Sequence, residues 1–257
     1  MWKAFKWLIF YIFVISFLIL GFSVYYISTG NTFSTLGNFI NDIRIYLVII
    51  IGLIFIPLLT YEYKKLNIKE KNFNYYYLYL LVAIFLSISY NVIGYYFNKH
   101  ILFSNLYDGN NDIVVGIIST VLIGPIIEEL MFRAIIYNNL KNKFSVKLSM
   151  LITTIVFAIC HFNIIQMVYA FIFGYILVVV YEKHKNIKYS IMMHITSNLI
   201  TTLVCLIIIK DYLYINAIML VVSLVLLCLL YIKLRKGYKD WKWWDIWKIY
   251  ILILMVS

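Results

Sequence analysis

Long apolar runs recur along this chain of 257 residues, and a run of about 20 residues is enough to cross the hydrocarbon core of a bilayer as a helix. Hydrophobic residues make up 64% of the chain and charged residues only 13%, against roughly 45–50% and about 25% in soluble domains. The sequence therefore excludes an ordinary soluble globule. It predicts an all-α, polytopic membrane helical bundle with about eight transmembrane helices. The predicted spans are residues 5–27, 43–61, 75–97, 113–140, 148–163, 164–181, 190–209 and 213–232.

The positive charges predict how this bundle is oriented. The net charge is +11, and most of the 22 Lys and Arg residues lie in segments that are cytosolic when the N-terminus is cytosolic. The positive-inside rule then places both termini in the cytosol. Because topology accounts for the basic excess, we expect the lipid bilayer as the partner of these charges and no nucleic acid.

The chain has the composition of one continuous membrane domain. No Pro-rich, Ser-rich or acidic stretch divides it, so we expect residues 1–257 to form a single integral membrane domain. The first apolar run is longer than the hydrophobic region of a signal peptide and is expected to remain as an anchor. Residues 246–257 are too few to span the bilayer, and we expect them to form an interfacial helix.

Five ionisable side chains lie inside the predicted spans, and they are Glu128, Glu129, Arg133, His161 and His194. A charge within a bilayer costs several kcal/mol unless it is paired or hydrated, so such residues are functional candidates by default. All five fall between residues 128 and 194. Function is therefore expected in the four spans between residues 113 and 209.

Helix geometry predicts how the two glutamates differ. Glu129 and Arg133 are four residues apart and share a helix face, so they can form an ion pair. Glu128 is rotated by about 100°, so this pairing leaves its carboxylate to face a cavity and act as a general base. Pro125, which follows Gly124 one turn upstream, is expected to kink the helix and open room for water.

Two further pairs have the same spacing. His194 and Asn198 share a helix face, and both side chains can donate hydrogen bonds to a developing oxyanion. Phe157 and His161 share a face of the fifth span. Counting about 1.5 Å per residue from the nearest cytosolic lysines, we expect both histidines, the asparagine and Glu128 to reach similar depths in the membrane.

These residues form three motifs in order, each on a separate predicted span. Residues Glu128–Arg133 read E-E-x-x-x-R, Phe157–His161 read F-x-x-x-H, and His194–Asn198 read H-x-x-x-N. Together they resemble the CPBP family of CAAX proteases and bacteriocin-processing enzymes, also called the Abi family of intramembrane proteases. The resemblance covers about residues 110–202, and the segment Phe171–Gly174 resembles a small-residue packing site of the family.

The resemblance implies a glutamic-type intramembrane endopeptidase. By this resemblance, Glu128 and His161 would activate water. His194 and Asn198 would stabilise the oxyanion, and Arg133 would orient the pair of glutamates. The implied catalytic residues are Glu128, Glu129, Arg133, His161, His194 and Asn198. The resemblance implies no cofactor.

Each residue type also has a plainer interpretation. Glu129 and Arg133 could be a buried ion pair that joins helices, and His161 could be a hydrogen-bonded interior histidine. His194 and Asn198 could bond neighbouring helices. Two histidines and a glutamate could also hold zinc with one open position, although the chain contains no H-E-x-x-H motif. Zinc is thus the alternative to the metal-independent mechanism.

Three classes of function fit the sequence. The expected one is an endopeptidase acting on a membrane-associated peptide or protein. The second is a catalytically silent immunity or scaffold protein of the same fold, and the third is an ion-coupled transporter, against which the single ionisable cluster counts. Richness in Ile, Lys, Asn and Tyr indicates an AT-rich, bacterial genome. We therefore expect a multi-pass protein of the bacterial plasma membrane that processes a bacteriocin or a signalling peptide, with a role in peptide maturation and self-immunity.

Overall fold

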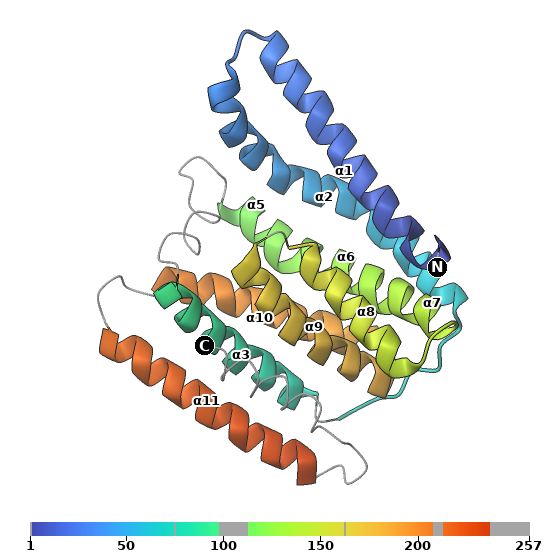
Figure 1. Ribbon diagram of the computed structural model, residues 1–257, viewed down its shortest axis with the longest axis vertical. Coiled ribbons are helices and arrows are strands. Elements are labelled where there is room, and N and C mark those ends of the chain that lie inside the picture. Colours follow the sequence, from blue (N-terminus) through green and yellow to red (C-terminus); the bar gives the residue numbers. More distant parts are fainter. Residues whose placement is uncertain (1, 75, 98–112, 162, 208–212, 237–257) are drawn as a thin grey trace. The chain divides into compact units, whose positions relative to one another are not determined.

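The computed structural model describes residues 2–74, 76–97, 113–161, 163–207 and 213–236 (Figure 1). Most of these residues are helical, and no β-strand occurs among them. The predicted all-α fold is therefore confirmed. The interfacial helix predicted for residues 246–257 lies outside the described residues.

Each of the eight predicted spans coincides with helical structure. Seven are single helices, namely α1 (Trp2–Ser28), α2 (Phe33–Lys65), α3 (Tyr77–Phe97), α8 (Val146–Ile159), α9 (Ile164–His184), α10 (Ile187–Ile207) and α11 (Leu213–Lys236). The remaining span is a continuous helical run that alternates between α-helical and π-helical winding. Its segments are α5 (Ile113–Ile117), η1 (Ile118–Ile123), α6 (Gly124–Glu129), η2 (Leu130–Tyr137) and α7 (Asn138–Lys141).

Several of these helices have the length and hydropathy of transmembrane segments. In the described part of the chain, five stretches are long and apolar enough to cross a membrane, and they are Ala4–Ser28, Phe33–Lys65, Tyr77–Gly94, Val114–Lys141 and Ile164–His184. The helices α8 and α11 are apolar but shorter there, and polar side chains interrupt α10. The protein is therefore a polytopic helical membrane protein, as predicted.

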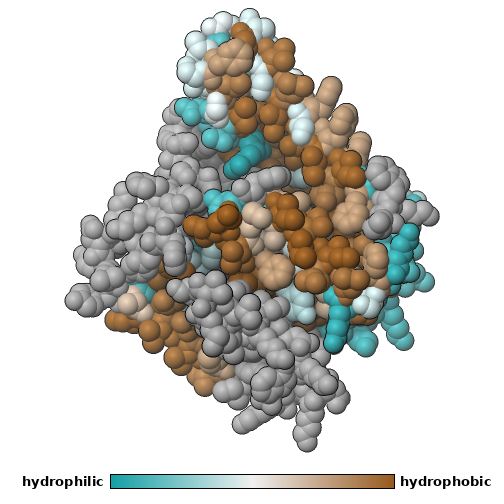
Figure 2. Space-filling view, in the orientation of Figure 1, coloured by the Kyte–Doolittle hydropathy of each residue, from teal (hydrophilic) through white to brown (hydrophobic). Residues whose placement is uncertain are grey.

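Apolar side chains lie on the outside of the helices as well as between them. Hydrophobic residues cover much of the face shown in Figure 2, and the exposed side chains of α1 and α2 include Phe13, Phe17 and Leu53. A large exposed apolar surface marks a contact with a membrane or a partner. On helices of this length, lipid is the partner that such a surface fits.

The helices form two compact units. The first unit contains α1, α2 and the helical run over residues 113–141, and it comprises residues 1–68 and 105–144. The second unit contains α3 and α8 to α11, and it comprises residues 69–104 and 145–257. The single integral membrane domain expected from the composition stays a prediction.

In the first unit, α1 and α2 form a hairpin and α2 packs against η1, α6 and η2. Gly30 lies in the hairpin turn with a φ of 92°, a conformation that glycine adopts at no steric cost. The tightest approach is at Gly52 of α2, where an added Cβ would overlap Cγ2 of Ile123. This close packing fixes α2 against the turns that precede Glu128.

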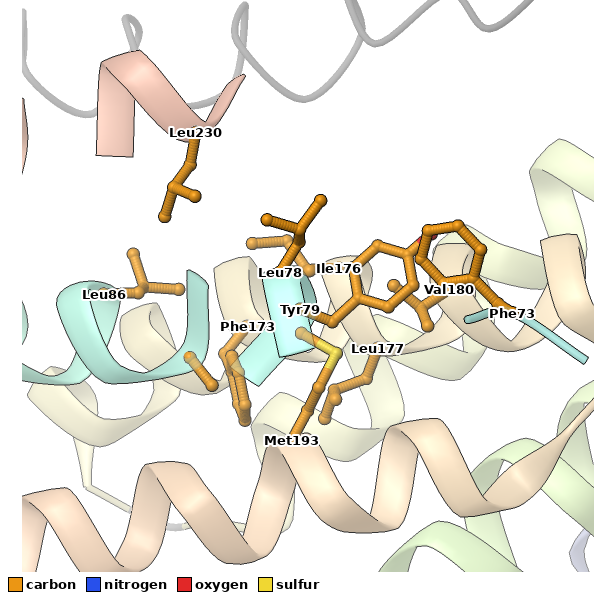
Figure 3. Packing of buried hydrophobic residues seen from close by; sticks show 11 residues of the cluster. Phe73, Leu78, Tyr79, Leu86, Phe173, Ile176, Leu177, Val180, Met193 and Leu230 are labelled. Carbon is orange, nitrogen blue, oxygen red and sulfur yellow. The ribbon is translucent and has the colours of Figure 1, made fainter. Parts of the chain in front are cut away.

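In the second unit, α3 packs against α10 and α11, and α9 packs against α8 and α10. A cluster of buried side chains fills the space between these helices (Figure 3). Its labelled members are Phe73, Leu78, Tyr79, Leu86, Phe173, Ile176, Leu177, Val180, Met193 and Leu230. The core of this unit thus lies where α3, α9, α10 and α11 face one another.

Candidate active site

Glu129 and Arg133 form a buried ion pair in the first unit. Nη1 of Arg133 donates a hydrogen bond to Oε1 of Glu129 over 2.7 Å, and both side chains are fully buried. The pairing predicted from the spacing of four residues is therefore present. Because removing one partner would leave a buried charge uncompensated, we expect the pair to stabilise the helical run where α6 passes into η2.

Glu128 has different surroundings from Glu129. Its side chain is half-buried and runs back along α6, so that its Oε1 lies 3.9 Å from the position of a Cβ added to Gly124. Tyr11 of α1 and Arg133 both interact electrostatically with Glu128. Of the two glutamates, Glu128 is the less buried residue.

The backbone around Pro125 changes from π-helical to α-helical winding, and the predicted kink stays a prediction. Pro125 lies in the first turn of α6, directly after the π-helical segment η1. The N–H of Gly124 donates to the carbonyl oxygen of Ser119, five residues earlier, which is the hydrogen bond of a π-helix. A second π-helical segment, η2, begins directly after Glu129. The two glutamates therefore lie on a short α-helical piece between two wider ones, an arrangement often found at functional sites.

His161 lies in the turn after α8, one helical turn beyond Phe157. The sequence places it inside the fifth span, whereas α8 ends at Ile159. Nδ1 of His161 is 2.9 Å from the carbonyl oxygen of Phe157. A carbonyl oxygen only accepts hydrogen bonds, so Nδ1 is the donor, and in the neutral imidazole the lone pair is then on Nε2. This hydrogen bond prepares Nε2 to accept a proton or a hydrogen bond.

The ring of Phe157 joins the two predicted histidines in the second unit. Its centroid lies 4.8 Å from that of His161 and 5.9 Å from that of His194, and both contacts are edge-to-face. His194 is buried and also touches Phe173 of α9, at 5.8 Å between ring centroids. The structure thus brings the second and third motifs together through one aromatic side chain.

Asn198 follows His194 by one turn of α10 and is half-buried. Its main-chain carbonyl oxygen accepts a hydrogen bond from the Thr202 hydroxyl over 2.9 Å. Because His194 and Asn198 both lie on α10 and are four residues apart, the imidazole and the carboxamide project from neighbouring turns of this helix, as predicted. Of the six predicted site residues, the three of the first motif lie in the first unit and the other three in the second.

The sequence analysis missed a cluster of hydroxyl groups on the helices that flank His194. Ser87 of α3, Tyr169 of α9 and Ser197 of α10 lie within hydrogen-bonding distance of one another. These hydroxyl groups are neutral, so the cost of a charge in the bilayer, which singles out ionisable residues, does not apply to them. A signal was available, because Ser87, Ser89 and Asn91 place three polar side chains within five residues of a mostly apolar span.

Residues 110–200 match one family model, which is described as Rce1-like: Type II CAAX prenyl endopeptidase Rce1-like. The matched segment contains all three motifs, from Glu128 to Asn198. In this segment, the chain is similar to the CPBP/CAAX protease family. No curated protein and no solved structure matches the chain. The resemblance stated from the motifs is thus confirmed, and the protein is a CAAX-type intramembrane protease in the general sense of that family.

Metal binding by this protein would need ligands in a particular arrangement. A catalytic zinc site needs three protein ligands, usually His, Cys, Asp or Glu, that converge on one point. The described residues contain no group of three or more such side chains that could hold a metal ion. The expectation of no cofactor stays a prediction, and chelation is the experiment that addresses it.

Proposed function

We propose that this CPBP-family protein is a glutamic-type endopeptidase that hydrolyses a peptide bond of a membrane-associated peptide or protein. The observation that supports it most is the contrast between two adjacent carboxylates. Glu129 is fully buried and paired with Arg133 at 2.7 Å, whereas Glu128 is half-buried on another side of the helix. Such a carboxylate, held in place by its neighbours, can take a proton from water as a general base.

The proposed reaction assigns one role to each motif. Glu128 takes a proton from water as the water oxygen attacks the carbonyl carbon of the substrate, and Nε2 of His161 accepts a hydrogen bond from the same water. His194 and Asn198 donate hydrogen bonds to the oxyanion that forms. When the C–N bond breaks, the proton passes from Glu128 to the leaving amine. The products are a carboxylic acid and an amine, and the enzyme is regenerated.

The substrate class follows from family and composition together. The matched family is described as prenyl endopeptidases, while richness in Ile, Lys, Asn and Tyr indicates a bacterial genome, where prenylated proteins are not expected. The proposed substrate is therefore a bacteriocin leader or a signalling peptide in the plasma membrane. Peptide maturation and self-immunity are the roles that such a substrate implies.

The experiment compares cells that express the wild type with cells that express Glu128→Gln. Mass spectrometry of peptide and protein termini in their membranes should find a terminus that is present with the wild type and absent with the variant. The substitution keeps the size of the side chain and removes its basicity. Glu62→Gln is the matched control, because Glu62 lies on α2 in an exposed ion pair with Lys65, and it should leave the terminus unchanged.

Three outcomes would change the proposal. A terminus that persists with Glu128→Gln at equal protein level would contradict the role of Glu128. Loss of wild-type processing after chelation would replace the metal-independent mechanism with a metal-dependent one. If the wild type and Glu128→Gln give the same termini and protect cells equally from a bacteriocin, the protein is a silent immunity protein instead.

A further inference from the structure

Three hydroxyl groups from three helices meet in the second unit, on the buried Ser87 and Ser197 and the half-buried Tyr169. Oη of Tyr169 lies 2.7 Å from Oγ of Ser197 and 2.9 Å from Oγ of Ser87. The Oγ atoms of Ser87 and Ser197 are themselves 2.9 Å apart. A hydroxyl can donate one hydrogen bond and accept two, so three hydroxyls can satisfy one another. The group, called here the hydroxyl triangle, links α3, α9 and α10.

A second polar contact lies one turn further along the same two helices. Nδ2 of Asn91 on α3 donates to Oγ1 of Thr201 on α10 over 3.1 Å. Asn91 follows Ser87 by four residues, and Thr201 follows Ser197 by four. The two contacts therefore have the same register, and α3 and α10 run parallel. Two contacts one turn apart fix both the rotation of α10 and its position along its axis.

The rotation of α10 decides where the proposed oxyanion donors point. With 3.6 residues per turn, His194 and Asn198 lie about 60° and about 100° from Ser197, on the same side of the helix. A rotation of α10 would therefore move the imidazole and the carboxamide together.

The hydroxyl triangle also reaches His194 through stacked rings. The ring of Tyr169 lies parallel to that of Phe173, with 5.5 Å between centroids. Phe173 in turn contacts His194 edge-to-face at 5.8 Å. Tyr169 also stacks with Tyr90 of α3, at 4.1 Å between centroids. One tyrosine therefore joins the hydrogen-bonded triangle to the aromatic contact of the histidine.

We propose that Tyr169, with Ser87 and Ser197, is a positioning residue that sets the rotation of α10 and thereby aims His194 and Asn198 at the substrate carbonyl. This inference rests on the proposed function for its consequence in catalysis. Ser87 and Asn91 lie outside the matched segment of residues 110–200, so part of the positioning comes from a helix that the family model does not cover.

The test uses single hydroxyl deletions in the full-length protein. Tyr169→Phe removes one corner of the triangle and leaves the contact between Ser87 and Ser197, so the protein should still fold. We expect kcat to fall about tenfold or more, because small displacements of catalytic groups are costly, and KM to stay within about twofold. The substrate is a synthetic peptide that spans the cleavage site identified with the wild type.

Two matched comparisons separate positioning from general stability. Ser89→Ala removes a buried hydroxyl from the same helix α3, but the hydrogen-bond partner of Ser89 is Ser223 of α11, at 2.7 Å. It should leave kcat unchanged. Thr201→Val should lower kcat because it removes the hydroxyl that Asn91 contacts, whereas Thr201→Ser, which keeps this hydroxyl, should retain wild-type kcat.

Hydrogen–deuterium exchange of α10 amides in lipid nanodiscs supplies a readout that needs no substrate. Tyr169→Phe should raise exchange in α10 over the wild type, and Ser89→Ala should not. If no substrate is cleaved by the wild type, the proposed function fails while the exchange result still decides the inference. Equal exchange in Tyr169→Phe and the wild type would overturn it, as would losses of kcat that are the same for Tyr169→Phe and Ser89→Ala.

Discussion

At the scale of single residues, burial gives the two adjacent glutamates different properties. Glu129 has its charge compensated by Arg133 inside the helix packing, with both side chains fully buried. Glu128, one residue earlier, is half-buried and lies over Gly124. A helix turns by about 100° per residue, so adjacent positions can serve one structural and one chemical role. The structural role of Arg133 can be measured independently of proteolysis.

Arg133→Met should destabilise the protein by about 3–5 kcal/mol, because it leaves the carboxylate of Glu129 buried without its main partner. The measurement is the amount of folded protein in membranes and its thermal unfolding in detergent. The double variant Glu129→Met/Arg133→Met removes both charges and should recover much of the folded protein. Lys65→Ala, which breaks an exposed pair with Glu62, should have no measurable effect. Normal abundance of Arg133→Met would show that the pair is not a structural requirement.

At the scale of elements, the helical run over residues 113–141 carries the glutamates and depends on α2 for its position. The π-helical segments η1 and η2 flank the α-helical piece that ends at Glu129. Gly52 of α2 lies against Ile123, at the end of η1, so closely that an added Cβ would overlap its Cγ2. Since Ile123 is branched at Cβ and cannot swing aside easily, the fit between the two helices leaves no room at this point.

Gly52→Ala should therefore lower the amount of folded protein and the rate of processing, although alanine is the better helix former by about 1 kcal/mol. Gly37→Ala is the control, because Gly37 lies on the same helix and an added Cβ there meets nothing within 4 Å. It should be neutral or slightly stabilising. The double variant Gly52→Ala/Ile123→Ala should recover folded protein. An unchanged abundance of Gly52→Ala would contradict the tight approach of α2 to η1.

At the scale of the whole molecule, the parallel packing of α3 and α10 agrees with the predicted order of membrane crossings. The contacts from Ser87 to Ser197 and from Asn91 to Thr201 have the same separation in sequence. The helical run over residues 113–141, α8 and α9 lie between the two helices in the chain. A parallel direction is what we expect if the run, α8 and α9 each cross the membrane once, although α8 has only 14 residues.

The orientation predicts which connections are cytosolic. In a background without the three native cysteines, Lys143→Cys between α7 and α8 should be protected from a membrane-impermeant maleimide on intact cells. Asn31→Cys, in the turn between α1 and α2, should be labelled. Both should react once the cells are permeabilised. The reverse pattern would show that the charge distribution does not set the topology of this chain.

Within the described residues, the positions of the helices and the local pairs could be predicted from sequence alone. These depend on hydrogen bonds and side-chain spacings within a few residues, and in a bilayer every backbone group must be satisfied inside its own helix. The pair of Glu129 with Arg133 is local in this sense, as is the spacing of His194 and Asn198. The contact of both histidines with Phe157 and the hydroxyl triangle join side chains that are far apart in the chain. Only tertiary packing decides such contacts, because they depend on how each helix is rotated and where it lies along its neighbours.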